Sequence, residues 1–325
     1  MHCAVVFAGF VAPYDPTNQN RELSFAAPTR LHWVDMQGEF HFRPFIYQSV
    51  ALPDGINEYE ESRNVQYPVH LFVRGEKYKI IGSLSSNIHL LGVTAPAQIF
   101  LAGTDNYGRD QFSRVLYGGR ISLAAGLLAT MVSLFIGLLV GTIAGFYGRW
   151  IDDSIMRMTE LFLVLPWLYL LLGVRSFLPL HLSPAQTFLL LVSVIGTIGW
   201  ARPARLIRGV VLSVKNRKYV LASRGFGGSD AHILRRHVLP HTYVVLLTQA
   251  VLLVPQYVIA EVTLSFLGLG LSEPSPSWGN LLTNLQQYNV LVSYWWMFAP
   301  ALALTVFCLG YLLVANAIHM RLESI

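Results

Sequence analysis

Long apolar runs without a single charged residue limit the possible folds of this chain more than any other feature. Three of them are Ile121–Tyr147, Thr242–Ala260 and Trp295–Ile318. A helix needs about 20 mostly apolar residues to cross a lipid bilayer, so each run is long enough for one span. Hydrophobic residues make up 54% of the 325 residues and charged residues only 13%, which is too apolar for a typical soluble protein. The sequence therefore predicts an all-α integral membrane protein.

Three further segments bring the predicted number of transmembrane helices to about six. Met158–Leu180 is interrupted by two charges, and Gln186–Leu212 carries three arginines in its second half, so we expect that span to end near Trp200. Residues 2–12 are apolar but only about half the required length. We interpret residues 1–12 as a first transmembrane helix that lacks its N-terminal half. A signal peptide is the alternative, although a basic leader region is missing.

Within the first long run, glycine recurs at every fourth position, as Gly137, Gly141 and Gly145. Small residues at this spacing allow two helix backbones to approach closely in lipid. We therefore expect another helix, from this chain or from a second subunit, to pack against this stripe.

Basic residues in short loops predict the orientation, because such loops stay on the cytoplasmic side. Leu178 to Ala185 and Phe266 to Trp296 contain no Lys or Arg. The region between the fourth and fifth spans, in contrast, carries nine: Arg202, Arg205, Arg208, Lys215, Arg217, Lys218, Arg224, Arg235 and Arg236. This region is therefore predicted to be cytoplasmic. The net charge of +5 then reflects topology and does not imply a nucleic-acid partner.

The polar stretch Lys215–His241 has the pattern of two short helices separated by a break. Helix-compatible residues from Tyr219 to Arg224 are followed by three glycines, which interrupt a helix. Ser229 is a good N-cap for the next helix, and we expect Pro240 to end that helix. The loop is therefore predicted to have a defined structure.

Residues 13–100 form a long extracytoplasmic segment with the pattern of β-structure. Leu31–Val34 and Glu39–Arg43 flank the turn sequence DMQG. Val69–Val73 and Lys77–Ile81 flank Arg74, Gly75 and Glu76 in the same manner. Two hairpins predict a small β-rich insertion between the first two transmembrane helices. Residues 101–325 are then predicted to form the transmembrane, helical domain of the chain.

Sites for metals or catalysis are not indicated by the sequence. His32 and His41 could lie on facing strands, but no further ligands follow at a spacing typical of a metal site. The two cysteines, Cys3 and Cys308, allow no disulfide framework. No catalytic residues, cofactor-binding residues or metal ligands are therefore predicted.

The polar stretch resembles the cytoplasmic coupling loop, or EAA loop, of bacterial ABC importer permeases. On that pattern, Leu221, Ala222 and Ser223 align with Glu-Ala-Ala, Gly227 with the following glycine, and Leu239 and Pro240 with the closing Leu-Pro. We name residues 213–241 the coupling segment. The resemblance implies that Tyr219 to Arg224 contact an ATPase subunit, with Arg224 as the polar edge. Leu221 replaces the family's acidic residue, which puts an ion pair at that position in doubt.

Two other stretches resemble permeases of dipeptide, oligopeptide and nickel importers. The first, GTDNYGRDQFSRVLYGGRISL, is similar to their segment before helix 2 and contains Gly103, Thr104, Asp105, Gly108, Arg109, Asp110, Ser113 and Arg114. We expect its charges to form a kinked, amphipathic lead-in at the membrane surface. The second is similar to their segment after helix 5 and contains Glu261, Leu264, Ser265, Phe266, Leu267 and Gly268. Trp278, Trp295 and Trp296 follow it and suit an aromatic belt at the bilayer interface.

The resemblance implies a fold of the type I ABC importer kind and a set of partners. These are a second permease chain, two cytoplasmic ATPase subunits, an extracytoplasmic solute-binding protein and the lipid of a bacterial inner membrane. No phosphate-binding G-x-x-x-x-G-K-[ST] loop occurs in the chain, so ATP and Mg²⁺ are expected on the ATPase subunits. The predicted substrate is a dipeptide or oligopeptide.

Three alternatives stay open on the sequence. A nickel or metal-chelate importer would share the same motifs. A secondary transporter should show buried coupling acids and internal repeats, and neither is evident. A membrane-bound enzyme should show a catalytic constellation, which is missing. The insertion at residues 13–100 could contact a solute-binding protein, cover the pore mouth or only decorate it.

Overall fold

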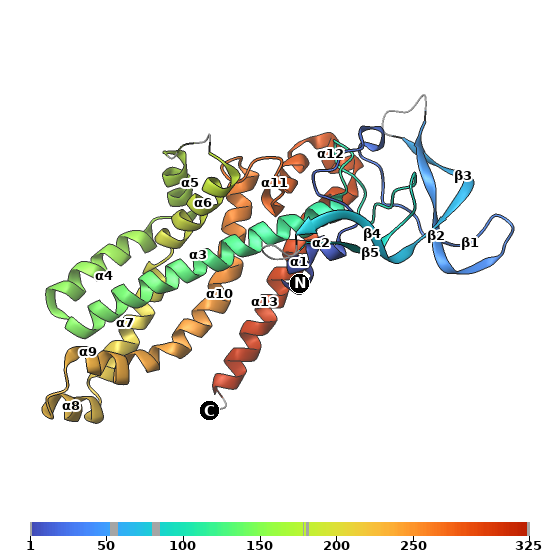
Figure 1. Cartoon of the computed structure of the whole chain (residues 1–325). Coiled ribbons are helices and arrows are strands. Elements are labelled where there is room, and N and C mark those ends of the chain that lie inside the picture. The colour runs from blue at the N-terminus through green and yellow to red at the C-terminus, as the bar shows by residue number, and fades with distance from the viewer. Residues whose placement is uncertain (1, 53–57, 80–84, 178, 180–181, 324–325) are drawn as a thin grey trace. The chain divides into compact units, whose positions relative to one another are not determined.

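A computed structural model describes residues 2–52, 58–79, 85–177, 179 and 182–323 (Figure 1). The chain divides into two compact units. Unit 1 comprises Met1–Ser122 and Ser265–Val306, and unit 2 comprises Leu123–Leu264 and Phe307–Ile325. Three long helices contribute residues to both units, and they are α3 (Gln111–Tyr147), α10 (Leu239–Phe266) and α13 (Ala299–Glu323).

Candidate membrane spans account for most of the helical residues. Three stretches of the described chain are long and apolar enough to cross a bilayer, namely Gln111–Tyr147, Asp230–Phe266 and Trp295–Ile318. Two bent pairs bring the number to five if each pair counts as one span. They are α4 (Arg149–Val164) with α5 (Trp167–Ser176), bent by 92°, and α6 (Pro184–Ile198) with α7 (Ala201–Lys215), bent by 44°. These five overlap the five longer apolar segments predicted from the sequence.

The predicted partial first helix forms two short helices in unit 1, α1 (His2–Val6) and α2 (Ala8–Val11). Ala8 and Ala12 are fully buried and pack in one cluster with Leu116 of α3. Arg120 of α3 donates hydrogen bonds to the carbonyl oxygens of Val5 and Val6. The apolar start of the chain is therefore held against the beginning of α3.

The glycine stripe of α3 packs against α7 of the same chain, within unit 2. A Cβ atom added at Gly137 would lie 2.7 Å from Pro203 Cβ, and one at Gly141 would lie 2.4 Å from the Ala204 carbonyl oxygen. The expected helical neighbour is therefore intramolecular. The first helix of the fourth span, α6, ends at Ile198, two residues before Trp200, and α7 follows after a 44° bend and runs beside the charge-free part of α3. The expectation that the membrane part ends near Trp200 stays a prediction.

The β-structure of unit 1 forms two small antiparallel sheets. One contains β1 (His32–Val34), β2 (Phe40–Ala51) and β3 (Tyr59–Pro68), and the other contains β4 (His70–Lys79) and β5 (Ser85–Gly92). The predicted hairpin around DMQG is confirmed, because β1 pairs with β2 and Gly38 has a φ of 83°. His32 pairs with Glu61 and His41 with Asp35, so the two histidines have separate partners.

The second predicted hairpin is wrong in the structure. Residues 70–79 form one continuous strand, β4, whose partner is β5, and the end of the predicted return strand lies outside the described residues. The pairing register shifts between Arg74 and Tyr78 instead of reversing. Gly75 lies at this bulge, where an added Cβ would be only 2.7 Å from His89 Cδ2. A glycine that signals a turn by sequence here marks a close approach between strands.

Short elements complete unit 1 and bury two of the three tryptophans expected at the membrane interface. They are the 3₁₀ helices η1 (Arg21–Leu23), η3 (Thr283–Gln286) and η4 (Trp295–Phe298), with α11 (Trp278–Leu282) and α12 (Tyr288–Ser293). Trp278 and Trp296 are buried, and their indole N–H groups donate to the carbonyl oxygens of Val115 and Thr104. Only Trp295, 69% exposed, fits the aromatic belt.

Candidate functional site

The coupling segment contains a short helix, α8 (Lys218–Gly225), where the sequence predicts one. Its C-terminus is closed by two backbone hydrogen bonds. The Gly228 N–H donates to the Ser223 carbonyl at 2.9 Å, and the Gly227 N–H donates to the Arg224 carbonyl at 3.1 Å. Gly227 has a φ of 83°, the left-handed conformation that this Schellman-type closure requires. The glycine break is thus a defined cap, which ends α8 and directs the chain into the next helix.

One side of α8 is anchored in the core of unit 2. Val220 is 1% exposed and belongs to a cluster with Phe146 of α3 and Val211 of α7. The same cluster includes Ile233 and Val238 from the following helical turns. Val220 therefore packs α8 directly against the ends of α3 and α7.

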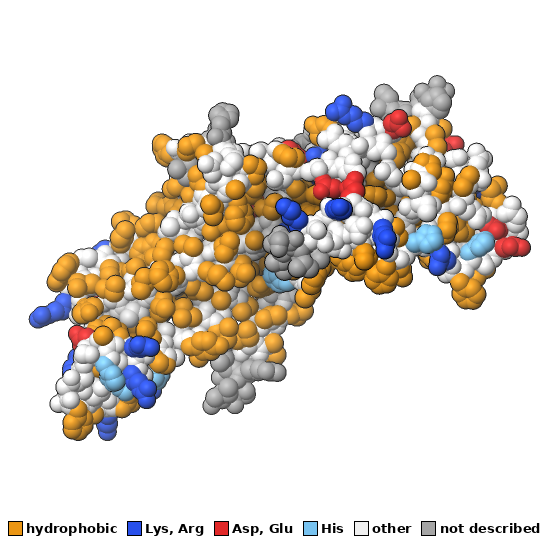
Figure 2. All heavy atoms as spheres, viewed as in Figure 1, with side chains coloured by type: hydrophobic (Ala, Val, Ile, Leu, Met, Phe, Trp, Pro, Cys, Tyr) orange, Lys and Arg blue, Asp and Glu red, His pale blue; other side chains and the backbone are white. Residues whose placement is uncertain are grey.

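The opposite side of α8 is exposed and partly apolar. Phe226 is 94% exposed and Leu221 is 52% exposed, and Ala222 is also at the surface. Lys and Arg side chains gather around this end of unit 2 (Figure 2). Exposed apolar side chains rimmed by polar ones are typical of a surface that binds another protein.

The second helix of the coupling segment does not stop at Pro240. Ser229 caps α9 (Asp230–Ile233) as predicted, because its side chain accepts a hydrogen bond from the His232 N–H. A π-helical turn (η2, Leu234–Val238) follows and leads directly into α10. Proline in a regular helix lacks a donor and clashes with the carbonyl four residues earlier. The wider π turn precedes Pro240 and gives that carbonyl room, so the helix continues.

Two other side chains of the coupling segment bind within the chain. The Tyr219 hydroxyl lies 3.3 Å from His241 Nε2. The Arg224 guanidinium lies 5.6 Å from the centre of the Phe146 ring and 3.5 Å from the Asp230 carboxylate. Arg224, expected as a polar edge of the partner contact, thus also fastens α8 to its own unit. Leu239 is half-buried and Pro240 is exposed at the start of α10.

Polar contacts join α7 to its neighbours near the coupling segment. The Arg208 guanidinium forms a two-pronged ion pair with Asp152 of α4, in which Nη2 and Oδ2 are 2.6 Å apart. Lys215 Nζ donates at 2.6 Å to the Gly145 carbonyl at the end of α3, where a cation favours the helix dipole. The two contacts fasten α7, which leads into the coupling segment, to α4 and α3.

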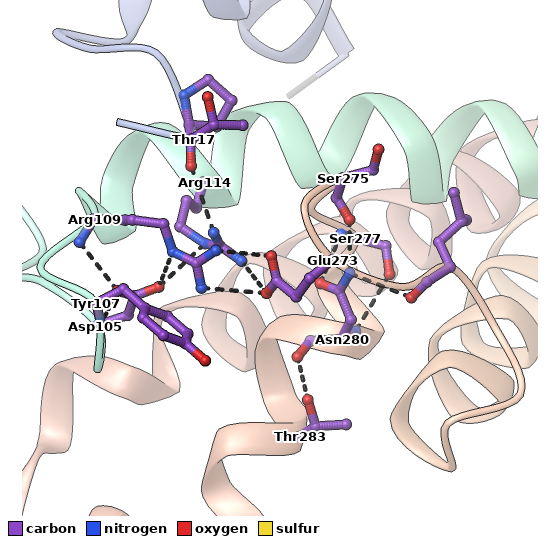
Figure 3. Close-up of polar contacts among 12 residues, drawn as sticks. Thr17, Asp105, Tyr107, Arg109, Arg114, Glu273, Ser275, Ser277, Asn280 and Thr283 are labelled. Atoms are coloured by element: carbon purple, nitrogen blue, oxygen red, sulfur yellow. Dashed lines mark hydrogen bonds and ion pairs between the residues drawn. The ribbon is translucent and has the colours of Figure 1, made fainter. Parts of the chain in front are cut away.

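The stretch before helix 2 forms an ionic cluster in unit 1 with two buried arginines and the half-exposed Glu273. Asp105 accepts from Arg109 Nε at 2.7 Å, and Glu273 pairs with Arg109 Nη1 at 2.8 Å and with Arg114 Nη2 at 2.6 Å (Figure 3). The expectation of an amphipathic lead-in is wrong, because the polar side chains of this stretch face inward. At most 4% of each is exposed for Thr104, Asp105, Arg109, Asp110, Ser113 and Arg114.

The two glycines of this stretch are needed for close contacts. Gly103 and Gly108 have φ values of 66° and 70°. An added Cβ at Gly108 would lie 1.7 Å from the Asn20 carbonyl oxygen. The loop therefore packs tightly against the segment that leaves α2.

Asp110 and Glu273, two carboxyl groups near the start of α3 and after α10, have shifted pKa values. Burial raises the pKa of Asp110 to about 6, although hydrogen bonds from the Ser113 N–H and hydroxyl oppose the shift. Burial alone would raise the pKa of Glu273, but the charges of Arg114 and Arg109 outweigh it and leave this pKa below its usual range. Glu273 is therefore the anionic partner of the two arginines at neutral pH.

The stretch after helix 5 covers the end of α10 and the turn that follows. Glu261 and Leu264 are fully buried in α10, and α10 ends at Phe266. The Gly268 N–H then donates to the Ser265 carbonyl at 3.0 Å, with a φ of 77° at Gly268. Leu267 is 49% exposed. Glycine is thus required to turn the chain toward Glu273.

Several residues of these sites were not predicted from the sequence. Glu273 is the only acidic residue from Phe266 to Trp296. This isolation could have marked it as a partner for the arginines of the stretch before helix 2. Asp152 and Arg208 are 56 residues apart, and Phe226 follows a basic helix, so no spacing rule identifies them. Among the described residues, no group of three His, Cys, Asp or Glu side chains could hold a metal ion.

Comparison with known families agrees with this arrangement. Residues 137–324, more than half of the chain and including the whole coupling segment, match the family model described as binding-protein-dependent transport system inner membrane component. The chain belongs to this family. It is therefore a multi-pass membrane permease subunit. The β-containing insertion lies outside the matched residues.

Curated relatives are permeases with peptide-related names. The chain is 38% identical over 213 residues to the dipeptide transport system permease protein DppC of Bacillus subtilis, which covers 65% of this chain and 64% of the relative. It is 37% identical over 222 residues to a putative peptide permease protein of Brucella suis, covering 67% and 72%. A solved structure of the methionine ABC transporter MetNI, in an inward-facing conformation, is 18% identical with a TM-score of 0.49, covering 63% of this chain and 94% of that chain.

Proposed function

We propose that this chain forms half of the membrane pathway of an ATP-driven importer for dipeptides or short oligopeptides. The observation that carries the proposal is α8, a capped helix with a buried anchor at Val220 and exposed apolar side chains at Leu221 and Phe226. The names of the relatives support peptides over nickel or metal chelates. The sequence motifs of the permease family support import as the direction.

The proposed complex contains a second, related permease chain, two cytoplasmic ATPase subunits and an extracytoplasmic solute-binding protein in a bacterial inner membrane. ATP and Mg²⁺ bind to the ATPase subunits in this proposal, and this chain binds no cofactor. Residues 101–325 supply the permease part, with residues 213–241 as its cytoplasmic coupling segment. Residues 1–12 and 13–100 supply an apolar start and an extracytoplasmic insertion. Exposed apolar side chains of the spans contact lipid or the second permease.

The proposed mechanism is alternating access driven through α8. The exposed side of α8 lies in a groove of an ATPase subunit, and closure of the ATPase pair on ATP displaces this helix. Val220 and the Asp152–Arg208 ion pair pass the displacement to α3, α4 and α7. Rigid mounting matters because a flexible loop would absorb the movement before it reached the transmembrane helices.

The experiment compares two nearly fully exposed phenylalanines on different units. Phe226→Ser removes the apolar side chain next to α8, and Phe42→Ser does the same on β2 of the insertion, where the side chain is 95% exposed. Neither change should affect folding, because more than nine-tenths of each side chain is exposed. We expect Phe226→Ser to weaken co-purification with the ATPase subunits by about tenfold and to abolish stimulation by the peptide-loaded binding protein. Phe42→Ser should leave the ATPase contact unchanged.

The coupling role of α8 and the peptide assignment can each be refuted by a separate outcome. Equal behaviour of both variants and the wild type in co-purification and stimulated ATP hydrolysis would show that α8 does not contact the motor. The peptide assignment is tested separately, by uptake of a labelled dipeptide and of a nickel chelate into proteoliposomes that contain the wild-type complex. Uptake of the chelate alone would refute the peptide assignment and leave the coupling role intact.

A further inference from the structure

A cavity of about 270 Å³ lies in unit 2 where two spans are broken. On one side, α4 ends at Val164 and α5 begins at Trp167 with a 92° bend. On another, α6 ends at Ile198 and α7 begins at Ala201 with a 44° bend. Residues of α10 close the cavity, among them Leu253, Gln256 and Tyr257. Non-helical backbone at membrane depth is tolerated where it lines a cavity, so a cavity at two such breaks is a candidate substrate site.

The breaks are built with specific side chains. Pro166 has no N–H to donate to the Phe162 carbonyl, which belongs to the cavity wall. At Gly199 an added Cβ would lie 1.8 Å from the Tyr257 hydroxyl, so only glycine leaves room for this tyrosine. The Tyr257 hydroxyl also lies 2.9 Å from Ser133 Oγ of α3. The cavity wall is therefore held in place by contacts among three helices.

The cavity lies level with the middle of the charge-free run of α3, Ile121–Tyr147. The charge-free part of α3 ends at Tyr147, and Gly137 precedes it by ten residues, about 15 Å along a helix. This is half of a hydrocarbon core of about 30 Å. An added Cβ at Gly137 would lie 3.3 Å from the Trp200 carbonyl oxygen and 2.7 Å from Pro203 Cβ, so the start of α7 is at the same depth.

Arg202 brings a positive charge to this depth. It lies in the first turn of α7, lines the cavity and is exposed in the isolated chain. Among the residues that the structure describes, no Asp or Glu lies within ion-pair distance of its guanidinium. A charged side chain in the centre of a bilayer faces a water-filled cavity or a partner group and marks a path for a solute.

We propose that Arg202 binds the carboxylate of the transported solute as it passes through this cavity, and that the solute is a peptide with a free C-terminal carboxylate. The guanidinium matches a carboxylate in charge and in planar geometry. The surrounding apolar wall, including Leu253 and Trp167, suits an apolar C-terminal side chain. The proposal rests on the proposed peptide-import function and names the part of the peptide that the membrane subunit recognises.

The test uses the complete importer in proteoliposomes, with binding protein saturated by either of two probes. The probes are alanyl-phenylalanine and its C-terminal amide, and uptake is divided by the measured loading of the binding protein. For Arg202→Gln we expect uptake of the free dipeptide to fall at least about tenfold, and uptake of the amide to change less than about twofold. Arg202→Lys should recover much of the loss. Arg205→Gln is the matched control, because Arg205 is an exposed arginine of α7 outside the cavity wall.

A second variant tests the charge without the amide probe. Arg202→Cys is made in a background in which Cys3 and Cys308 are replaced by Ser. We expect uptake of the free dipeptide to recover after reaction with an aminoethyl methanethiosulfonate, which adds a positive charge, and not after a sulfonatoethyl reagent, which adds a negative one.

The outcomes separate this inference from the proposed function. Equal slowing of both probes by Arg202→Gln, or equal recovery with both reagents, would overturn the role of Arg202 while leaving peptide import in place. The same holds if Arg205→Gln slows the free dipeptide as strongly. A wild-type complex that takes up neither probe, although ATP hydrolysis is stimulated, would overturn peptide import and the inference with it.

Discussion

Alanine at Gly227 should loosen the coupling segment without any steric clash. Gly227 has a φ of 83°, and no atom lies within 4 Å of the position that a Cβ would occupy. The cost of Gly227→Ala is therefore the cost of the left-handed backbone alone, about 1–2 kcal/mol for a residue with a side chain. A cost of about 1 kcal/mol lowers the ratio of the capped to the uncapped form about fivefold.

Gly225→Ala is a control with the same added methyl group. Gly225 is the last residue of α8, its φ is not positive, and its Cβ position is also open. Alanine is favoured over glycine in a helix by up to about 1 kcal/mol, so this variant should stabilise α8 or leave it unchanged. The pair thus separates backbone conformation from surface chemistry.

Hydrogen–deuterium exchange of the detergent-solubilised protein measures the difference directly. The Gly228 and Gly227 amides, which donate to the Ser223 and Arg224 carbonyls, should exchange at least about fivefold faster in Gly227→Ala and no faster in Gly225→Ala. Binding-protein-stimulated ATP hydrolysis should fall in the first variant only. The reasoning is refuted if the two variants exchange at the same rate, because the left-handed cap would then contribute nothing to α8.

Three further perturbations have expected outcomes. Val220→Ala removes buried methyl groups and should lower the free energy of unfolding by about 1–2 kcal/mol in a denaturant titration; no loss would place this side chain outside the core. Asp152→Asn should weaken the tie to Arg208 and lower binding-protein-stimulated transport more than basal ATP hydrolysis. The double variant Asp152→Arg with Arg208→Asp should restore transport. If the single variant does not lower transport and the double variant does not restore it, the ion pair does not transmit movement from α8. Burial raises the pKa of Asp110 to about 6 from 3.8, so the stability it contributes is full below about pH 4 and lost as the pH rises through 6. Asp110→Asn should therefore reduce the change of the unfolding temperature with pH between pH 4 and 7. If that pH dependence is unchanged, another group is responsible for it.

Local features of the coupling segment could be predicted from the sequence because their causes are local. Glycine at 227 allows a left-handed cap, and Ser229 can accept a hydrogen bond from an amide three residues ahead. The turn before β2 is of the same kind, with Gly38 at its end. Each depends on a few neighbouring residues, so sequence alone is sufficient.

Predictions failed where residues outside the motif itself decided the structure. Gly75 suggests a turn, but His89 on the neighbouring strand makes it a bulge. Pro240 suggests a helix end, but the preceding π turn lets the helix continue. The charges before helix 2 suggest a solvent-exposed surface. Glu273, more than 150 residues away, pairs with Arg109 and Arg114 and offsets the cost of burying their charges.

The sequence by itself determined that the chain is a membrane protein, which segments are apolar enough to span, and which loop carries the family's coupling pattern. These follow from hydropathy, charge and local backbone preferences, which act over a few residues. The tertiary structure alone decided that Arg202 lines a cavity beside the charge-free part of α3, because its position depends on how closely α7 approaches the glycine stripe of α3. Packing between helices is a property of two surfaces, and one sequence segment does not specify its partner.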